Sequence, residues 1–115
     1  MNFDSLDEFE KDLKKLSKRR FKSLFEDLDT IKKLLRENPT EKPPLSFRIT
    51  GLRISTSIIK LKKFACKSVK SKGTNSGMRL IYTFDKQENT ITFIELYHKG
   101  DKSTEDKSRI YKYFS

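Results

Sequence analysis

Basic residues dominate one internal segment of the chain. Between Lys42 and Phe84 there is no acidic residue, and the rest of the chain holds equal numbers of basic and acidic residues. The whole net charge of +10 therefore belongs to this segment. A positive field concentrated in this way attracts polyanions, so the pattern favours nucleic acid, or an acidic protein, as a partner. The ten basic residues are Lys42, Arg48, Arg53, Lys60, Lys62, Lys63, Lys67, Lys70, Lys72 and Arg79.

Other residues offer less chemistry. Glu95 is the only carboxylate inside an apolar stretch, where it could be a general base, although a salt-bridged position at the sheet surface is the favoured interpretation. Cys66 lies beside Lys67, which would lower the pKa of an exposed thiol, but a half-buried structural cysteine is favoured. One Cys and one His do not make a disulfide or a zinc cage. No glycine pattern typical of a phosphate-binding loop and no Ser-His-Asp triad can be identified. We therefore expect no cofactor and no metal.

Length and hydropathy indicate a single domain without a membrane span. The 115 residues suit a single domain spanning 1–115. No apolar run approaches the ~20 residues that cross a bilayer, and the acidic N-terminus lacks the layout of a signal peptide. We expect a cytoplasmic protein with no membrane partner.

Two helices are predicted within residues 5–36. Ser5 and Glu8 have the spacing of a capping box. An apolar stripe at steps of three and four residues follows, and a second stripe begins at Phe21 and stops before Pro39. Core packing is the favoured interpretation of both stripes, which predicts a helical hairpin.

The second half of the chain predicts a small antiparallel sheet over about residues 54–97. Three prolines in 37–53 indicate a loop there. Alternation in 54–66, β-rich residues at 78–84 and an apolar stretch at 90–97 predict three strands. Ser103 and Asp106 are expected to cap a short final helix at about 103–113. The fold class is α+β, with a helical hairpin packed on a small twisted sheet, a short C-terminal helix and the helices on one side.

The same half carries a family resemblance. The strings that carry it are Phe64-Ala-Cys-Lys-Ser, Ser76-Gly-Met-Arg-Leu-Ile-Tyr82 and Phe93-Ile-Glu-Leu-Tyr-His-Lys99, followed by Asp101-Lys102 and Glu105-Asp106. With the paired helices at 5–36, they resemble the RelE/ParE superfamily of type II toxin–antitoxin toxins. The resemblance implies a helical hairpin on a twisted sheet. Families of this type often begin with an edge strand, which must be short or absent here.

The resemblance implies two possible activities. RelE-like members cleave messenger RNA, many of them on the ribosome, whereas ParE-like members poison DNA gyrase and lack the basic catalytic set. The charge distribution favours the RelE-like activity. The residues expected to be catalytic are Arg79, Lys67, Lys70, Lys72, His98 and Lys99, and those expected to bind RNA are Lys60, Lys62, Lys63, Tyr97 and Lys102.

Metal-free RNA cleavage explains the roles expected for these residues. The 2′-hydroxyl attacks the adjacent phosphorus, so the protein must supply a base, an acid and cations for the pentacoordinate phosphate. The planar fork of Arg79 suits the phosphate. Crowded lysines lower one another's pKa, so Lys67, Lys70 or Lys72 could be the base. His98 titrates near neutral pH and could be the acid or base. Tyr97 could stack on a nucleobase or belong to the core.

The partners expected from the resemblance are a cognate antitoxin, messenger RNA and the ribosome. Two alternatives remain open at this point. One is a ParE-like inhibitor of DNA gyrase, and the other is a non-catalytic relic that binds RNA or an antitoxin.

Overall fold

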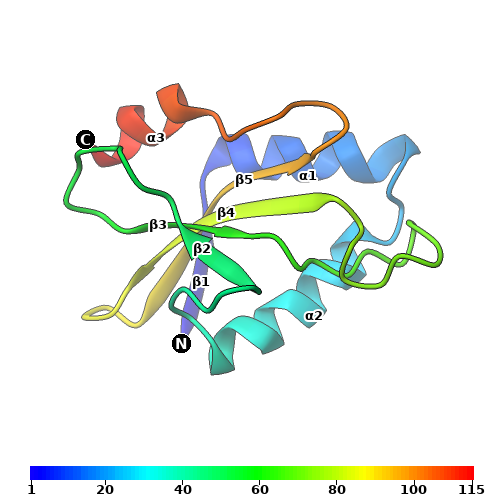
Figure 1. Ribbon diagram of the computed structural model, residues 1–115, viewed down its shortest axis with the longest axis horizontal. Helices are drawn as coiled ribbons and strands as arrows, with labels where there is room; N and C mark the ends of the chain where they lie inside the picture. Colours follow the sequence, from blue (N-terminus) through cyan, green and yellow to red (C-terminus); the bar gives the residue numbers. More distant parts are fainter.

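Eight elements form one five-stranded sheet with three helices around it. A computed structural model describes residues 1–115. The elements are β1 (Asn2–Ser5), α1 (Asp7–Arg19), α2 (Leu24–Glu37), β2 (Ser46–Arg48), β3 (Ile58–Leu61), β4 (Met78–Asp85), β5 (Thr90–His98) and α3 (Lys107–Phe114) (Figure 1). The strand order is β1-β5-β4-β3-β2, with β1 parallel to β5 and every other pair antiparallel. The predicted α+β class is confirmed.

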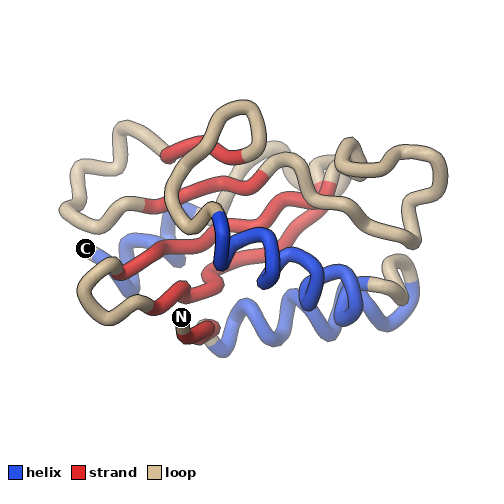
Figure 2. Tube along the Cα trace, turned by 90° about the horizontal axis from the view of Figure 1, so that it is seen from below, coloured by secondary structure: helices blue, strands red, loops and turns tan.

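The helices cover both faces of the sheet (Figure 2). On one face α1 and α2 pack against alternate residues of β4, such as Leu80 and Tyr82, in a core of 17 buried residues. On the other face α3 contributes Ile110 to a smaller core of 6 buried residues that includes Ile81. The expectation of helices on one side is therefore wrong for α3. β4 has apolar residues on both of its faces. The face away from α1 and α2 is therefore buried by another element, which is α3.

Both edge strands are short, and both lie outside the predicted sheet range of about 54–97. β1 is a strand of four residues paired with the start of β5. The predicted capping box is wrong because Ser5 ends β1 and its hydroxyl donates to Glu10 Oε2 at 2.5 Å, while Leu6 occupies the N-cap. β2 begins two residues after Pro44, within the expected loop, and pairs on one side only, as edge strands near proline do.

A register shift in β5 turns Glu95 toward α3. Ile81 pairs with Glu95 and Tyr82 with Phe93, so Ile94 is an extra residue in β5. The Glu95 carboxylate then accepts the backbone N–H of Asp106 at 2.7 Å, just ahead of α3. Asp106 is the N-cap and accepts the N–H of Arg109 at 3.1 Å, so the final helix begins at Lys107 rather than near Ser103.

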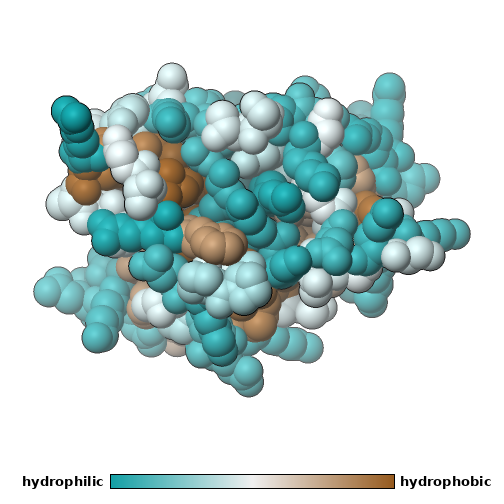
Figure 3. Space-filling view, in the orientation of Figure 1, coloured by the Kyte–Doolittle hydropathy of each residue, from teal (hydrophilic) through white to brown (hydrophobic).

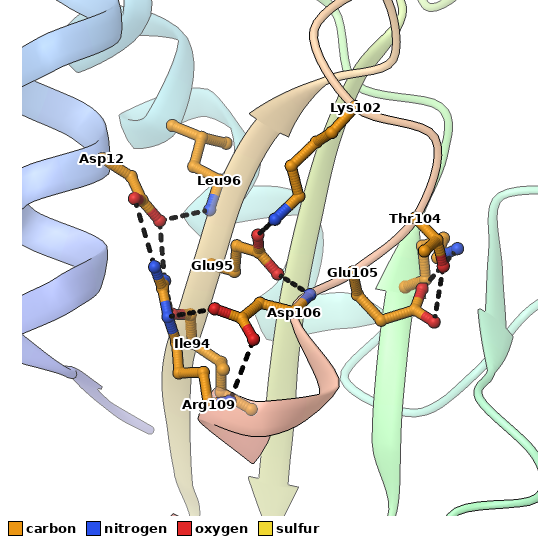
Figure 4. Close-up of polar contacts among 10 residues, drawn as sticks. Asp12, Ile94, Glu95, Leu96, Lys102, Thr104, Glu105, Asp106 and Arg109 are labelled. Atoms are coloured by element: carbon orange, nitrogen blue, oxygen red, sulfur yellow. Dashed lines mark hydrogen bonds and ion pairs between the residues drawn. The ribbon is translucent and has the colours of Figure 1, made fainter.

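Helix side chains protect the open edge of β5 (Figure 4). β1 pairs only as far as Phe93. Beyond it, Asp12 of α1 accepts the Leu96 N–H at 3.1 Å, and Arg109 of α3 donates to Ile94 O at 2.8 Å. Asp12 and Arg109 also form an ion pair at 2.8 Å. These contacts occupy backbone groups that would otherwise invite another strand. No helix in the structure is long and apolar enough to cross a membrane.

Candidate nucleic-acid site

A hollow of about 290 Å³ opens where α3 does not cover the sheet. Arg79 lies on the α3 face of β4, and Tyr97 beside it on β5 belongs to the α3 core. The face that carries β2 is mostly hydrophilic (Figure 3). We call this site the basic hollow, and its lining residues are Pro44, Phe47, Lys62, Lys63, Asn75, Gly77, Arg79 and Lys99.

Four cations surround the basic hollow without any carboxylate among its lining residues. None of Lys62, Lys63, Arg79 and Lys99 takes part in an ion pair. Arg79 Nη1 donates to Lys62 O at 3.2 Å and to Met78 O at 3.4 Å, whereas Nη2 makes no hydrogen bond within the protein. Lys63 Nζ donates to Asn75 Oδ1 at 2.8 Å. The hollow is therefore suited to an anion that brings its own negative charge.

The Ser-Gly-x-Arg string positions the start of β4. The Ser76 hydroxyl donates to Phe64 O at 2.5 Å and accepts the Met78 N–H at 3.1 Å. Gly77 has φ +87, and a Cβ there would lie 2.7 Å from His98 Nε2 and 3.1 Å from Lys99 Cγ. Only glycine allows this close approach of β4 to the end of β5. The string thus holds Arg79 and Lys99 at the same hollow.

His98 has no free ring nitrogen. Its Nε2 lies 2.9 Å from Ser76 O, and its Nδ1 accepts the Gly100 N–H at 3.0 Å. Both ring nitrogens are thus engaged with backbone atoms. The ring also stacks on Phe21, with centroids 5.3 Å apart. The side chain does not line the basic hollow, and its contacts are those of a residue that holds the β5–α3 turn.

The three loop lysines expected to supply the base lie away from the basic hollow. Lys67 and Lys70 line a different hollow beside Cys66, and Lys72 does not line the basic hollow either. Lys67 Nζ is paired with Glu26 at 2.5 Å, and this hydrogen bond raises the pKa of Lys67. The expected lowering of its pKa by neighbouring lysines is wrong, because a carboxylate of α2 is its closest charged partner.

Lys60, Tyr97 and Lys102 are engaged on the α3 face. Lys60 pairs with Glu105 at 2.6 Å, and Lys102 pairs with the Glu95 carboxylate (Figure 4). Tyr97 is 5% exposed and packs in the α3 core, so of its two expected roles the structure shows the core one. None of the three lines the basic hollow.

The Lys60–Glu105 pair makes stability depend on pH. Burial is the largest single influence and raises the pKa of Glu105, but the contacts with Lys60, the backbone and Thr104 together outweigh it, so the pKa of Glu105 is lowered. The pair therefore stabilises the fold above the unfolded pKa of about 4.3, and this stabilisation is lost as the pH falls through the folded pKa. We expect Lys60→Met to cost about 2–3 kcal/mol at pH 7, because it leaves Glu105 buried and unpaired.

Urea unfolding at pH 7 and pH 3 measures this effect. At pH 3 the unpaired carboxyl is protonated, so the cost of Lys60→Met should shrink. Lys62→Met is the matched control, since Lys62 has no ion pair, and its cost should be small at both pH values. An equal cost of Lys60→Met at both pH values would contradict the assignment.

Sequence reasoning missed Phe47 and Asn75. Phe47 is 37% exposed, and Lys62 Nζ lies 5.1 Å from its ring centroid. It faces the basic hollow because it pairs with Lys60 across β2 and β3. An aromatic residue among the basic residues of the acid-free segment could have indicated a nucleic-acid contact. Because 37–53 was predicted to be a loop, Phe47 was not considered as part of the sheet.

The remaining candidate residues are Glu95 and Cys66. Glu95 is salt-bridged as favoured, although it is buried at 2% exposure rather than at the surface. No group of three or more His, Cys, Asp or Glu residues could hold a metal ion. Cys66 is buried, and burial raises the pKa of its thiol.

The burial of Cys66 predicts slow thiol chemistry. We expect Cys66 to react with Ellman's reagent at least about 100-fold more slowly in the folded protein than in urea, because reaction requires exposure and a thiolate. Stopped-flow absorbance with and without denaturant measures the two rates. Rapid labelling of the native protein would show that the loop around Cys66 opens freely.

Comparison with known proteins identifies the fold. The archaeal RelE of Pyrococcus horikoshii OT3, solved in complex with RelB, matches with a TM-score of 0.55 at 13% identity, covering 88% of this chain and 97% of that chain. The conserved hypothetical protein HP0892 of Helicobacter pylori matches with a TM-score of 0.54 at 24% identity, with the same coverage. No protein-family model and no curated protein matches the sequence. The chain has the fold of RelE, as the resemblance predicted.

Proposed function

We propose that this chain, with its RelE fold, is the toxin of a type II toxin–antitoxin system that cleaves messenger RNA, on the ribosome, without a metal. The observation that carries the proposal is the basic hollow. Four unpaired cations and an exposed aromatic ring converge there, with no carboxylate to repel phosphate. Binding a segment of RNA requires positive charge for the phosphate and an exposed aromatic surface on which a nucleobase can stack.

The proposed reaction uses the RNA's own nucleophile. A base removes the 2′-hydroxyl proton, the oxygen attacks phosphorus, the bond from phosphorus to the 5′-oxygen breaks, and that oxygen takes up a proton. The products are a 2′,3′-cyclic phosphate and a 5′-hydroxyl. Arg79 binds the phosphate through its free Nη2 and neighbouring donors. Of the groups lining the hollow, only the lysine amines can exchange a proton, so we assign the base and the acid to two of Lys62, Lys63 and Lys99.

The other expected site residues take supporting roles in this proposal. Lys70 and Lys72 are exposed on the loop before β4 and would contact RNA outside the hollow. His98 acts as a positioning residue, because its two backbone contacts hold the turn that carries Lys99. A cognate antitoxin and the ribosome are the proposed partners, and the cytoplasm is the proposed location.

A non-catalytic RNA-binding protein is the second candidate. It is favoured by the state of His98, which has no ring nitrogen free for proton transfer. Such a protein would use the same hollow and differ only in leaving the RNA intact.

The test is cleavage of a defined messenger with and without purified ribosomes, with the product ends mapped. We expect cleavage with ribosomes, and a loss of at least about 100-fold in Lys62→Gln/Lys63→Gln. The matched control is Lys67→Gln/Lys70→Gln, which removes two lysines outside the hollow and should change the rate less than about threefold.

Other outcomes would point elsewhere. Salt-sensitive binding without cleavage supports the second candidate. Intact RNA together with linearised plasmid in arrested cells contradicts both and supports a gyrase-directed toxin. Equal losses in the two double variants would show that the hollow is not the site.

A further inference from the structure

The loop between β2 and β3 leaves nearly all of its backbone donors unpaired. It spans residues 49–57 and passes beside the C-terminal end of α3 (Figure 1). The N–H of Ile49 donates to Ile58 O at 2.8 Å, but no N–H of residues 50–57 donates a hydrogen bond to any protein atom. Backbone donors in a folded chain pair with protein, water or a ligand, so this loop can offer a run of donors to a ligand.

Contacts with α3 hold the loop in place. Leu52 is buried in the α3 core, and Ile49 and Ile54 pack against the same core. Tyr111 of α3 donates its hydroxyl to Leu52 O at 3.0 Å. Arg53 has φ +57, a left-handed conformation that a residue with a side chain rarely adopts unless its surroundings impose it. The loop therefore presents its donors in an arrangement that is fixed before any ligand binds.

The loop borders a hollow of about 210 Å³ whose polar lining carries only positive charge. We call it the loop hollow, and its polar lining residues are Arg48, Thr50, Arg53 and Thr56. Both arginine side chains are exposed and take part in no ion pair. Glu41 accepts the backbone N–H of Arg48 at 3.2 Å, but its carboxylate does not line the loop hollow.

We propose that the loop hollow binds a phosphate group. Guanidinium groups and runs of unpaired backbone N–H groups are the donors that bind phosphate oxygens in proteins. The loop hollow combines both kinds of donor, and no carboxylate in its lining repels an anion.

The backbone of an RNA strand supplies this phosphate more readily than a free phosphate compound does, because the two hollows adjoin. Phe47 lines the basic hollow, and the next residue, Arg48, lines the loop hollow. An RNA strand bound in the basic hollow can therefore continue along β2 and place a second phosphate in the loop hollow.

This inference deepens the proposed function, on which the role of the loop hollow in RNA binding rests. The phosphate bound there lies outside the link that is cleaved, so its contacts are the same in the bound substrate and in the transition state. Such contacts raise affinity without raising turnover. RNA that is too short to reach both hollows gains nothing from the second one.

The first experiment measures affinity by fluorescence anisotropy with 2′-O-methyl oligouridylates, which have no free 2′-hydroxyl and cannot react. We expect Arg48→Gln/Arg53→Gln to lower the affinity for an oligomer of about ten nucleotides by about tenfold or more. The affinity for an oligomer of about three nucleotides should fall less than about threefold. The rate of messenger cleavage at saturating protein should also stay within about threefold of the wild type.

Two further variants control this experiment. Lys33→Gln/Lys86→Gln removes the same charge from exposed residues outside both hollows, and it should lower affinity less than about threefold at either length. Arg48→Gln/Arg53→Gly removes both guanidinium groups while glycine accepts the left-handed backbone, so it should reproduce the loss if charge is its cause.

The second experiment uses inorganic phosphate alone and follows the amide NMR shifts of the full chain. We expect shifts in residues 50–57 that are lost in Arg48→Gln/Arg53→Gln. A protein that cleaves no RNA would still show these shifts, so failure of the proposed function and failure of this inference can be told apart. Phosphate-induced shifts without any length-dependent loss of RNA affinity would support the phosphate site with a free phosphate compound as its source.

Three results would overturn the proposal. They are equal losses of RNA affinity in the arginine variant and the lysine control, phosphate-induced shifts confined to the basic hollow, and the absence of any phosphate-induced shift in residues 50–57.

Discussion

Arg79→Ala should reduce cleavage of ribosome-bound messenger by about 100-fold to 1,000-fold, the loss typical of removing one group that stabilises charge in the transition state. Arg79 is held at the basic hollow by Lys62 O and Met78 O, and its Nη2 is free to meet a phosphate oxygen. The extra negative charge on the pentacoordinate phosphate exists only in the transition state. The variant should therefore lose turnover more than it loses affinity for RNA. Single-turnover kinetics at saturating protein separate the two quantities.

Two matched variants sharpen this test. Arg79→Lys keeps the charge but not the planar fork, so it should recover only part of the rate. Arg48→Ala removes an exposed arginine of β2 that does not line the basic hollow, and it should leave cleavage within about threefold of the wild type. A full rate in Arg79→Ala, in protein shown to be folded, would remove Arg79 from the mechanism.

Gly77→Ala should have the largest effect on stability among single substitutions at the site. A Cβ would lie 2.7 Å from His98 Nε2, on a residue with φ +87. We expect a cost of about 3 kcal/mol, the sum of left-handed backbone strain and overpacking. The same Cβ would press on Lys99 Cγ at 3.1 Å, so cleavage should fall as well. Urea unfolding and the cleavage assay measure the two effects.

Gly73→Ala is the matched control for backbone strain. Gly73 has φ +53, but a Cβ there would meet nothing within 4 Å. It should cost about 1–2 kcal/mol and leave cleavage unchanged. If the clash with His98 explains why Gly77→Ala costs more than Gly73→Ala, the costs of Gly77→Ala and His98→Ala should not add. The double variant should then be at least about 1 kcal/mol more stable than the sum of the two single costs predicts. Additive costs would place the strain elsewhere.

These predictions concern residues that local sequence patterns could find. The β-rich residues at 78–84 correspond to β4, in which Leu80 and Tyr82 belong to one core and Ile81 to the other. The apolar stripes of 5–36 likewise correspond to α1 and α2. Such patterns predict helices and strands because the hydrophobic period of each element is set by residues only a few positions apart.

Other features of the site could not be found in this way. β2 has only three residues and follows two prolines, so no periodicity reveals it, yet it brings Phe47 to the basic hollow. The capping box at Ser5 was wrong because β1 already uses the backbone there. Of the two residues expected to cap the final helix, Asp106 is confirmed as the N-cap and Ser103 is not part of the cap.

The sequence by itself determined that the protein is α+β and that its excess charge is positive and confined to 42–84. Only the tertiary structure decided which cations are free. Lys67 meets Glu26 from 41 positions away, and Lys60 meets Glu105 across the α3 face, whereas Lys62 and Lys63 meet no carboxylate. The physical reason is that charge neutralisation depends on distance in space, which the order of residues along a chain does not contain.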